Sequence, residues 1–459
     1  MPDHDHHHDH DAPTHAHHHG SVAHEPSANW KHDYDEAYRA AEPNPGRQIV
    51  PIELETSECD WEFAPGKTTR AWAFNRCVPG PTIEAHVGDV LQIRLKNRLP
   101  EPTAVHWHGL RLPAAMDGTE MVQRPIPSEG LFLYRFKLLD AGTFWYHPHV
   151  NETVQLERGL YGPIIVRGPE EPQLDAERVF ILDDVKLGKD GQVKPPGGWM
   201  EQHSGRQGGT RLVNGHQEPE ITIAAGQIER WRIVNASSAR SVRLSIGGAP
   251  FRVIGTGGGL IERPVTKTDW LIVAANRADL AVGPFEEGQV LRLQSVSKEG
   301  GKRGDLYATV RVGPARPSQA SIPDVLRRIE PLAAGAAVPT REVHFGWKPG
   351  MKHGGHFLVN EEAHHRDKPV CVGELQIWDV INDTLMDHPF HLHGFFFQVV
   401  DINGEKPEFL SWEDTMNIPP KGRVRIAWMP DDRPGEWMYH CHILEHHAAG
   451  MMAHFEIVR

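Results

Sequence analysis

The sequence predicts an all-β fold made of three sandwich domains. Alternating apolar segments bounded by Gly, Pro and Asn indicate short strands joined by turns. The 44 glycines and 37 prolines make up about 18% of the chain, against an average of about 12%. A length of 459 residues, at about 150 residues per domain, gives about three domains. Helical bundles and coiled coils are therefore disfavoured.

The predicted strands fall into three blocks along the chain. The first block, 45–168, contains GDVLQIRLKNRLP, GLFLYRFKLLDAGTFWYH and LYGPIIVRGPEEP. The second, 169–313, contains VFILDDVKL, EITIAAGQIERWRIVNAS and DWLIVAANRADLAV. Residues 314–340 are rich in Pro, Ala and Ser and are predicted to be a linker with one helical turn at 324–329. The third block is 341–459, and each block has the length of a sandwich domain.

Residues 1–44 precede these blocks as a His/Asp-rich tail and lead-in, which we expect to be disordered at its start. Ten of the 31 histidines lie before residue 25. The segment lacks the apolar core of a signal peptide, so either an export signal has been removed or the protein is not exported. The tail is either a disordered extension without a role or an arm that collects transition metals.

Composition and charge exclude several classes of function. The formal net charge is −13, and no basic cluster offsets it, so nucleic acid and anionic membrane surfaces are unlikely partners. No apolar run approaches the roughly 20 residues needed to cross a bilayer, which predicts a protein without membrane insertion. Four cysteines do not make a disulfide framework in a chain of this length. Cys59, Cys77 and Cys371 are expected to be buried or paired, and their disulfide state is left open.

Histidines outside the tail concentrate in four short motifs, each of which contains a His-x-His pair. On a strand, residues i and i+2 point to the same face, so each pair can present two imidazoles to one metal cluster. Chance predicts roughly one such pair in this stretch of chain. The motifs are His106-Trp-His108, His147-Pro-His149, His388-Pro-Phe-His391-Leu-His393, and His440-Cys441-His442 followed by His446.

The last motif indicates two metal sites served by one strand. In 440–442 the two imidazoles point one way and the thiolate the other. His446 and Met451 follow Cys441 at suitable distances, and His388 is left over from the third motif. A thiolate, two imidazoles and a weak axial thioether are the ligands of a blue-copper electron-transfer site. The other eight histidines would hold several ions, and imidazole and thiolate ligands favour copper over calcium or magnesium.

The segments HWHG, WYHPHV, HPFHLHG and YHCHILEHHAAGMM resemble the signature of the multicopper oxidases, the family that contains laccases, and stand in the family's order. The resemblance covers residues 45–459. It implies three cupredoxin-like Greek-key domains and four copper ions per chain, with a trinuclear cluster between the first and third domains. By position, it implies a type 1 copper on His388, Cys441, His446 and Met451; a type 2 copper on His106 and His391; and two type 3 coppers, one on His108, His147 and His442 and the other on His149, His393 and His440.

The implied reaction couples one-electron oxidation of small organic reductants or metal ions to the four-electron reduction of dioxygen to water. Single electrons would enter at the type 1 site, and Cys441 would pass them to the cluster through its neighbours. Phenolic and aromatic substrates are favoured because the 11 methionines form no Met-rich tract. The His-rich tail favours the alternative, a cuprous or ferrous metallo-oxidase in copper tolerance. The resemblance implies a periplasmic or secreted location, and cytoplasmic residence and the oligomeric state stay open.

Other classes of protein compete with this interpretation. Zinc also binds His and Cys, but it has no redox chemistry and gains nothing from a cysteine between two histidines. A nitrite-reducing copper protein would not need that bridge or eight cluster imidazoles. A non-catalytic copper-binding relative would be expected to lack some ligands, whereas all twelve positions are filled here.

Oxygen reduction also consumes protons, and two residues are predicted to relay them. Asp117 matches an acidic position that relatives place beside the type 2 copper; alternatively, it is a turn residue before Gly118. His447 stands where many bacterial relatives carry a carboxylate directly after the type 1 histidine. A neutral imidazole can also relay protons, with an ordinary pKa of about 6.5.

Overall fold

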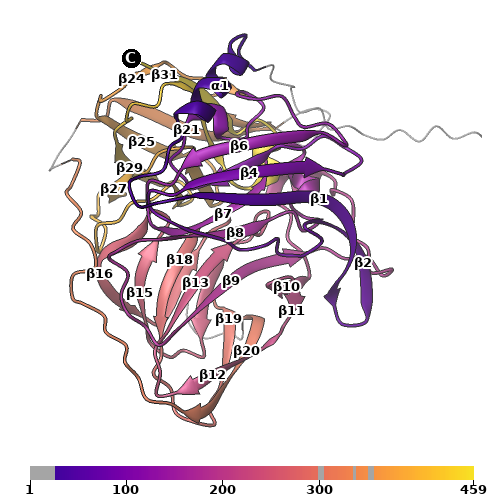
Figure 1. Ribbon diagram of the computed structural model, residues 1–459, viewed down its shortest axis with the longest axis vertical. Coiled ribbons are helices and arrows are strands. Elements are labelled where there is room, and N and C mark those ends of the chain that lie inside the picture. The colour runs from indigo at the N-terminus through magenta and orange to yellow at the C-terminus, as the bar shows by residue number, and fades with distance from the viewer. Residues whose placement is uncertain (1–25, 298–303, 334–337, 350–355) are drawn as a thin grey trace, which may run out of the picture.

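The computed structural model describes residues 26–297, 304–333, 338–349 and 356–459. Six β-sheets pair into three sandwiches, and each hydrophobic core is formed by residues from both of its sheets. This confirms the all-β prediction. The first and third sandwiches lie together in the upper part of Figure 1, and the middle sandwich lies below them. Residues 1–25, and with them both interpretations of the His-rich tail, lie outside the described residues.

The first sandwich follows the N-terminal helix α1 (Trp30–Ala40). Its core surrounds Trp107, which is fully buried. One sheet has the order β2 (Lys67–Phe74), β1 (Ile49–Ala64), β4 (Val90–Asn97), β6 (Leu131–Lys137), and the other β3 (Ile83–His86), β8 (Gly162–Arg167), β7 (Gly142–Pro148), β5 (Val105–His108). The short helices are the 3-10 turn η1 (Ala114–Met116) and α2 (Glu152–Gln155).

The middle sandwich is built around Trp231 and carries one short helix, α3 (Trp199–Ser204). One sheet has the order β11 (His216–Gln217), β10 (Thr210–Val213), β9 (Ala176–Val185), β13 (Glu229–Asn235), β18 (Arg277–Val282), β15 (Phe251–Thr256), β16 (Gly259–Lys267). The other has the order β12 (Glu220–Ala225), β20 (Asp305–Ala315), β19 (Val290–Ser295), β14 (Val242–Ile246), β17 (Asp269–Ile272).

The third sandwich is built around Trp378 and carries the short helix α4 (Leu444–Ala448). One sheet has the order β22 (His356–Val359), β21 (Arg341–Lys348), β25 (Gln376–Asn382), β29 (Arg423–Trp428), β27 (Gln398–Ile402). The other has the order β23 (His365–Arg366), β31 (Met452–Val458), β30 (Gly435–Cys441), β26 (His388–Leu392), β28 (Thr415–Ile418), with β24 (Val370–Cys371) also paired to β31.

Two segments outside the sheets differ from the sequence prediction. The helical turn predicted at 324–329 does not form; the segment is irregular, with a bend at Asp324, and Leu326 donates its backbone N–H to the Glu262 carbonyl of the middle sandwich at 2.9 Å. Burial of Leu326 in the core of that sandwich overrides the weak local helix preference. Helix α1, in contrast, was not predicted. None of its residues is fully buried, but Tyr34, Ala37 and Tyr38 pack against the core of the first sandwich, and Tyr34 donates to the Leu133 carbonyl at 2.8 Å.

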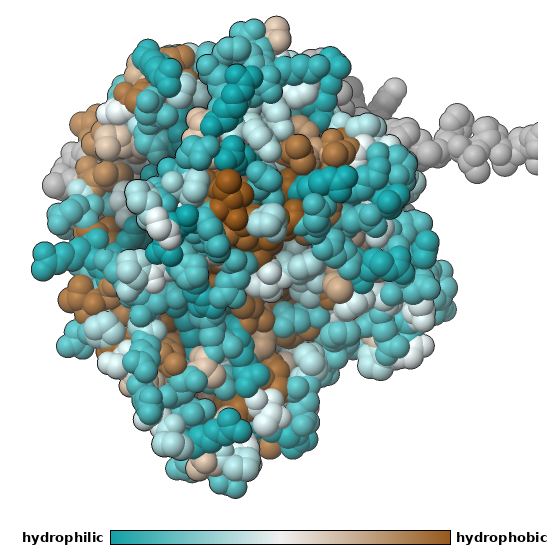
Figure 2. All heavy atoms as spheres, viewed as in Figure 1, coloured by the Kyte–Doolittle hydropathy of each residue, from teal (hydrophilic) through white to brown (hydrophobic). Residues whose placement is uncertain are grey.

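Hydropathy of the surface, membrane-length helices and the cysteines can be compared with the sequence predictions. On the face shown in Figure 2, hydrophilic residues predominate and apolar residues form separate patches. No helix within the described ranges is both long and apolar enough to cross a membrane. All four cysteines lie in those ranges, and none forms a disulfide; Cys59 and Cys441 are buried, and Cys77 and Cys371 are exposed.

Candidate metal centres

Strand register brings the histidine motifs together in pairs. In the first sandwich, β5 pairs with β7 so that His106 lies opposite His147. In the third, β26 pairs with β30 so that His391 lies opposite His440. Residues directly opposite in an antiparallel pair have Cβ atoms about 5 Å apart, so each pairing places two histidine motifs side by side.

The two sandwiches face each other through these histidines. The rings of His108 and His391 stack with centroids 3.8 Å apart, and those of His106 and His393 lie 4.0 Å apart. All eight histidines of this group, which we call the eight-histidine cluster, are buried: His106, His108, His147, His149, His391, His393, His440 and His442. The structure therefore brings together imidazoles from residues more than 300 positions apart in the chain.

Hydrogen bonds fix the orientation of six of these rings. In each, Nδ1 donates to a backbone carbonyl or a carboxylate, which places the proton on Nδ1 and leaves the Nε2 lone pair free. The carbonyl acceptors, all at 2.9 Å, are Asp117 for His106, Pro148 for His147, Asp414 for His391 and Cys441 for His440. The carboxylate acceptors are Glu152 for His149 at 2.9 Å and Asp117 for His393 at 2.8 Å.

The free nitrogens converge on shared space. Nε2 of His106, His147, His149 and His391 is buried without a hydrogen-bond partner among the described residues. Ligand atoms of His149, His393 and His440 lie within 4.8 Å of one another, as do those of His106, His391 and His393 and those of His106, His108 and His147. Buried polar atoms normally have partners, so these orphaned lone pairs fit metal ions.

Burial also keeps the cluster in the protonation state that binds metals. It is the largest cause lowering the pKa of six of the imidazoles, with neighbouring histidines adding to it in most. Neutral imidazole is the form that coordinates a metal. The six are His108, His147, His391, His393 and His440, and His442, whose pKa falls to about 3.

A second site lies on the opposite face of β30, around Cys441. Its Sγ is 3.3 Å from Nδ1 of His388 and 3.7 Å from Nδ1 of His446, and the two Nδ1 atoms are 3.2 Å apart. All three residues are fully buried. Burial raises the pKa of the Cys441 thiol, so a metal is needed to hold it as thiolate.

Met451 lies beside this triad and is fully buried. Its backbone N–H donates to the His446 carbonyl at 2.9 Å, and its carbonyl accepts from the Cys441 N–H at 3.1 Å. Met452, on β31, is also buried, but it lies opposite His440 in the register.

The two predicted proton-relay residues both contact the eight-histidine cluster. Asp117 is 2% exposed; its Oδ1 lies 3.3 Å from His106 and its Oδ2 2.8 Å from His393. It also ends η1, donating its N–H to the Ala114 carbonyl at 3.0 Å, so both interpretations of this residue describe part of its geometry. The His447 ring stacks on His440 with centroids 4.3 Å apart.

Sequence analysis missed a buried carboxylate at this point. Glu152 contacts His149 through Oε1 at 2.9 Å and His447 through Oε2 at 3.1 Å. Glu152 therefore links His447 to the eight-histidine cluster. Its position three residues after the His147-Pro-His149 motif is a signal that could have identified it.

A second missed group lies on the other side of the cluster. Asp414 is 3.3 Å from His108 Nε2 and receives a bidentate contact from Arg277 of β18, with Nη1–Oδ1 at 2.7 Å. Thr415 Oγ1 lies 3.0 Å from His108 Nε2. The middle sandwich, which holds none of the predicted ligands, thus supports the cluster through Arg277.

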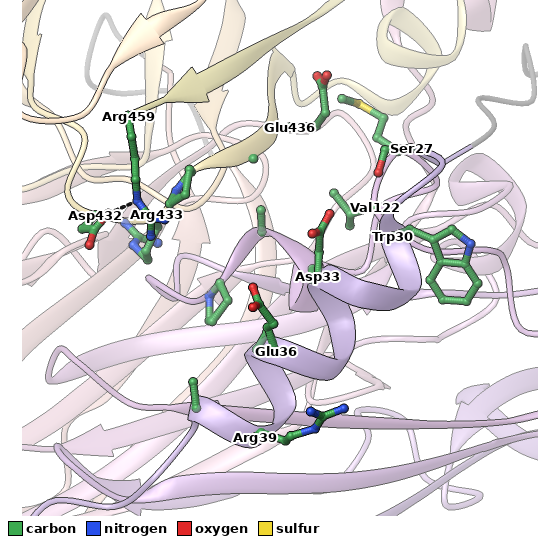
Figure 3. A pocket seen from close by; sticks show the side chains of 18 residues that line it. Ser27, Trp30, Asp33, Glu36, Arg39, Val122, Asp432, Arg433, Glu436 and Arg459 are labelled. Carbon is green, nitrogen blue, oxygen red and sulfur yellow. Dashed lines mark hydrogen bonds and ion pairs between the residues drawn. The ribbon is translucent and has the colours of Figure 1, made fainter.

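A pocket of about 740 Å³ lies away from the proposed metal ligands. It lies between α1 and the end of the third sandwich, and Figure 3 shows acidic side chains of α1 (Asp33, Glu36) across from Arg433 and Arg459. Arg459 Nε donates a hydrogen bond to Oδ1 of Asp432 at 2.9 Å. None of the predicted copper ligands lines this pocket.

Fold and sites together define a protein of three cupredoxin-like sandwiches with one thiolate–imidazole site and one cluster of eight imidazoles. Models of the multicopper oxidase family match residues 55–171, 184–287 and 341–459. The chain is 31% identical to "Multicopper oxidase MmcO" of Mycobacterium tuberculosis over 92% of this chain and 90% of the relative. It is 26% identical to "Laccase" of Bacillus subtilis over 85% and 90%.

Solved structures agree with these relatives. A multicopper oxidase of Campylobacter jejuni, described as a metallo-oxidase, superimposes with a TM-score of 0.79 at 31% identity over 89% of this chain and 91% of that one. The chain belongs to the multicopper oxidase family. It is a copper-dependent oxidoreductase that uses dioxygen as electron acceptor, and its family holds four coppers: one type 1, one type 2 and two type 3.

Proposed function

We propose that the chain reduces dioxygen to water at the eight-histidine cluster with electrons collected one at a time at Cys441, as the sequence predicts. The observation that carries this is the pattern of ring nitrogens. In the cluster six rings turn Nε2 inward, whereas around Cys441 both rings turn Nδ1 inward. Two differently oriented sets of lone pairs, one on each face of β30, support two different metal sites.

The proposed ligand sets follow the sequence prediction. His388, Cys441, His446 and Met451 would hold the type 1 copper, which accepts one electron per reductant. The cluster histidines would hold the other three coppers: His106 and His391 the type 2; His108, His147 and His442 one type 3; and His149, His393 and His440 the other. The compact triple of His149, His393 and His440 supports the last of these sets directly.

Within this proposal, residues of the chain handle the protons that oxygen reduction consumes. The carboxylate oxygens of Asp117 contact His106 of the first sandwich and His393 of the third, so Asp117 is placed to transfer protons to the cluster from both halves. Glu152 and His447 form a hydrogen-bonded pair that extends outward from His149. His447 is about a tenth exposed, which suits proton entry from the solvent side.

The reductant is proposed to be a small organic molecule, with phenols favoured by the scattered methionines. A metallo-oxidase function is the second candidate, and one observation favours it: Nε2 of His446 is occupied by a carbonyl, so no imidazole of the type 1 site meets solvent. We also propose that the protein is periplasmic or secreted, as the family resemblance implies.

The test combines copper analysis with oxygen uptake. The purified chain should bind about four copper ions, and those ions should support oxygen consumption with guaiacol or with Cu(I) as reductant. Oxygen consumption without hydrogen peroxide release indicates complete reduction at the cluster. A chain that binds this copper and consumes no oxygen with either reductant would be a copper-binding protein without the proposed activity.

A further inference from the structure

The indole of Trp145 lies against three imidazoles of the eight-histidine cluster. Trp145 is on β7, two residues before His147, so both side chains point to the same face of the strand. Their rings stack with centroids 4.3 Å apart and an interplanar angle of 27°. The register of β5 and β7 places His108 directly opposite Trp145, with ring centroids 5.2 Å apart. The ring of His442, from the third sandwich, lies 5.9 Å from the indole.

Two of these three rings lack the Nδ1 hydrogen bond that orients the other cluster histidines. Nδ1 of His108 and both ring nitrogens of His442 are buried without a hydrogen-bond partner among the described residues. His108 is still held through Nε2 by the Thr415 hydroxyl at 3.0 Å. His442 has only packing to orient it, whereas a metal-binding histidine normally gains its orientation from a hydrogen bond. Within the described ranges, its ring contacts are four other cluster histidines and Trp145, the one neighbour that is not a proposed ligand.

The three histidines beside Trp145 form one of the two proposed type 3 sets. In the part of the chain that the structure describes, Trp145 makes no ring contact with the other set. That set is contacted by His447, which stacks on His440 at 4.3 Å and lies 3.1 Å from Glu152. One set is thus backed by an apolar indole and the other by a polar, titratable pair.

Trp145 is anchored in an apolar core to which all three sandwiches contribute. This core also contains Tyr161 of the first sandwich, Val234 of the middle one and Leu444 of the third, and Trp145 itself is 1% exposed. Close packing of this kind resists the movement of a large ring. Nε1–H of Trp145 is buried without a partner among the described residues, although a buried indole normally has one. Packing, and not a hydrogen bond, therefore sets the position of the ring.

Resting on the proposed type 3 assignment, we propose that Trp145 is a positioning residue that holds His108, His147 and His442 in metal-binding geometry before copper arrives. One rigid ring contacts all three, and it supports most strongly the histidine that no hydrogen bond orients. The middle sandwich supplies no ligand, but its packing holds the indole against the site. Contacts that orient metal ligands typically change metal affinity by about 10–100-fold.

The first test measures ring mobility in the copper-free full-length chain, by mass spectrometry of hydrogen–deuterium exchange at the histidine Cε1 atoms. Trp145→Leu should raise the exchange rate of His442 by about tenfold through local opening, and that of His108 by a smaller factor. His149 and His393, which have no ring contact with Trp145 in the described structure, should exchange at unchanged rates. Unchanged exchange at His442, or an equal rise throughout the cluster, overturns the proposal. Trp145→Ile replaces the leucine variant if that chain does not fold.

The second test measures copper retention in the copper-loaded chain. Trp145→Leu should lose about one copper ion per chain to EDTA about tenfold faster than the unmodified chain, while the blue band stays unchanged. The copper left alone in the type 3 pair should become visible by electron paramagnetic resonance. Trp145→Phe keeps a ring beside His147 and should restore slow copper loss. Equal loss from every site, or a phenylalanine variant that loses copper as fast as the leucine variant, overturns the proposal.

Trp107 provides the matched control, because it lies on the neighbouring strand β5 with its side chain on the opposite face from His106 and His108. It is also fully buried, and its Nε1 also lacks a partner among the described residues. Its ring packs against Tyr134 at 5.1 Å and Phe136 at 5.5 Å. Trp107→Leu should lower the urea midpoint of unfolding but leave histidine exchange and copper loss unchanged.

A Trp107→Leu chain that reproduces the Trp145→Leu results would show general loosening of the sandwich, and the proposal would be wrong. The His-rich tail is present in every variant, so any copper bound there cancels in the comparison. An unmodified chain that binds no copper in the cluster would refute the type 3 assignment instead, and the exchange test would still decide the role of Trp145.

Discussion

Breaking the contact between Arg277 and Asp414 should destabilise the chain more than any surface ion pair can. Arg277 is fully buried and Asp414 almost so, and two guanidinium nitrogens contact the two carboxylate oxygens. Removing one partner of a buried pair leaves an uncompensated charge, which costs about 3–5 kcal/mol. Arg277→Met should therefore lower the free energy of unfolding of the copper-free chain by about 3–5 kcal/mol.

The assay is urea unfolding of the full-length chain, with single and double variants compared as a cycle. Asp414→Asn should also destabilise, but the double variant should cost less than the sum of the single effects by at least about 2 kcal/mol, because neither charge is then left alone. Arg311→Met is the matched control: Arg311 and its partner Glu220 are each 53% exposed, so its cost should stay below about 1 kcal/mol. Additive single effects, or a loss at Arg277 no larger than at Arg311, would refute this reasoning.

Four further predictions concern colour, oxygen reduction and pH. Cys441→Ser should remove the blue absorption band and substrate oxidation together, because the thiolate–copper bond is the source of both; a variant that keeps its colour would show that the type 1 site lies elsewhere. Asp117→Asn should slow reoxidation by oxygen and leave reduction of the blue site intact, and stopped-flow spectra separate these two half-reactions. Reoxidation at the unmodified rate would show that Asp117 is only a turn residue. His447→Glu should shift the pH dependence of turnover without abolishing turnover. Burial raises the pKa of Glu413 to about 7, so the folded chain holds a proton that the unfolded chain releases near pH 4.5, and stability falls as pH rises between these values. Glu413→Gln should remove about 3 kcal/mol of that fall between pH 4.5 and pH 8, measured by urea unfolding; an unchanged pH dependence would contradict the raised pKa.

The metal ligands could be proposed from the sequence because their pattern is local. A His-x-His pair on a strand is visible within three residues, and alternation around Cys441 separates the two sites without knowledge of the fold. Glu152 is also close in sequence to a motif and could have been found. Arg277 and Asp414 are 137 residues apart, and nothing in either segment marks them as partners.

Other features carry no sequence signal of any kind. The group that covers His446 is a backbone carbonyl, which every residue possesses, so only the folded chain shows that His203 supplies it. Helix α1, in contrast, does carry an apolar stripe, because Trp30, Tyr34, Ala37 and Tyr38 recur at helical spacing, and this signal could have identified it. The segment 324–329 was assigned the wrong local structure because its burial depends on the distant middle sandwich.

The division of the eight-histidine cluster between the first and third sandwiches has a consequence for biogenesis. The ribosome makes His106 to His149 well before His391 to His442, so the early sandwich displays four imidazoles with nothing opposite them. This half-site offers ligands to any divalent ion in the compartment where the chain is made. Correct metal loading is therefore favoured when the metals enter after the third sandwich has docked. At that stage the geometry of the complete site, and not the affinity of four imidazoles alone, selects the ion.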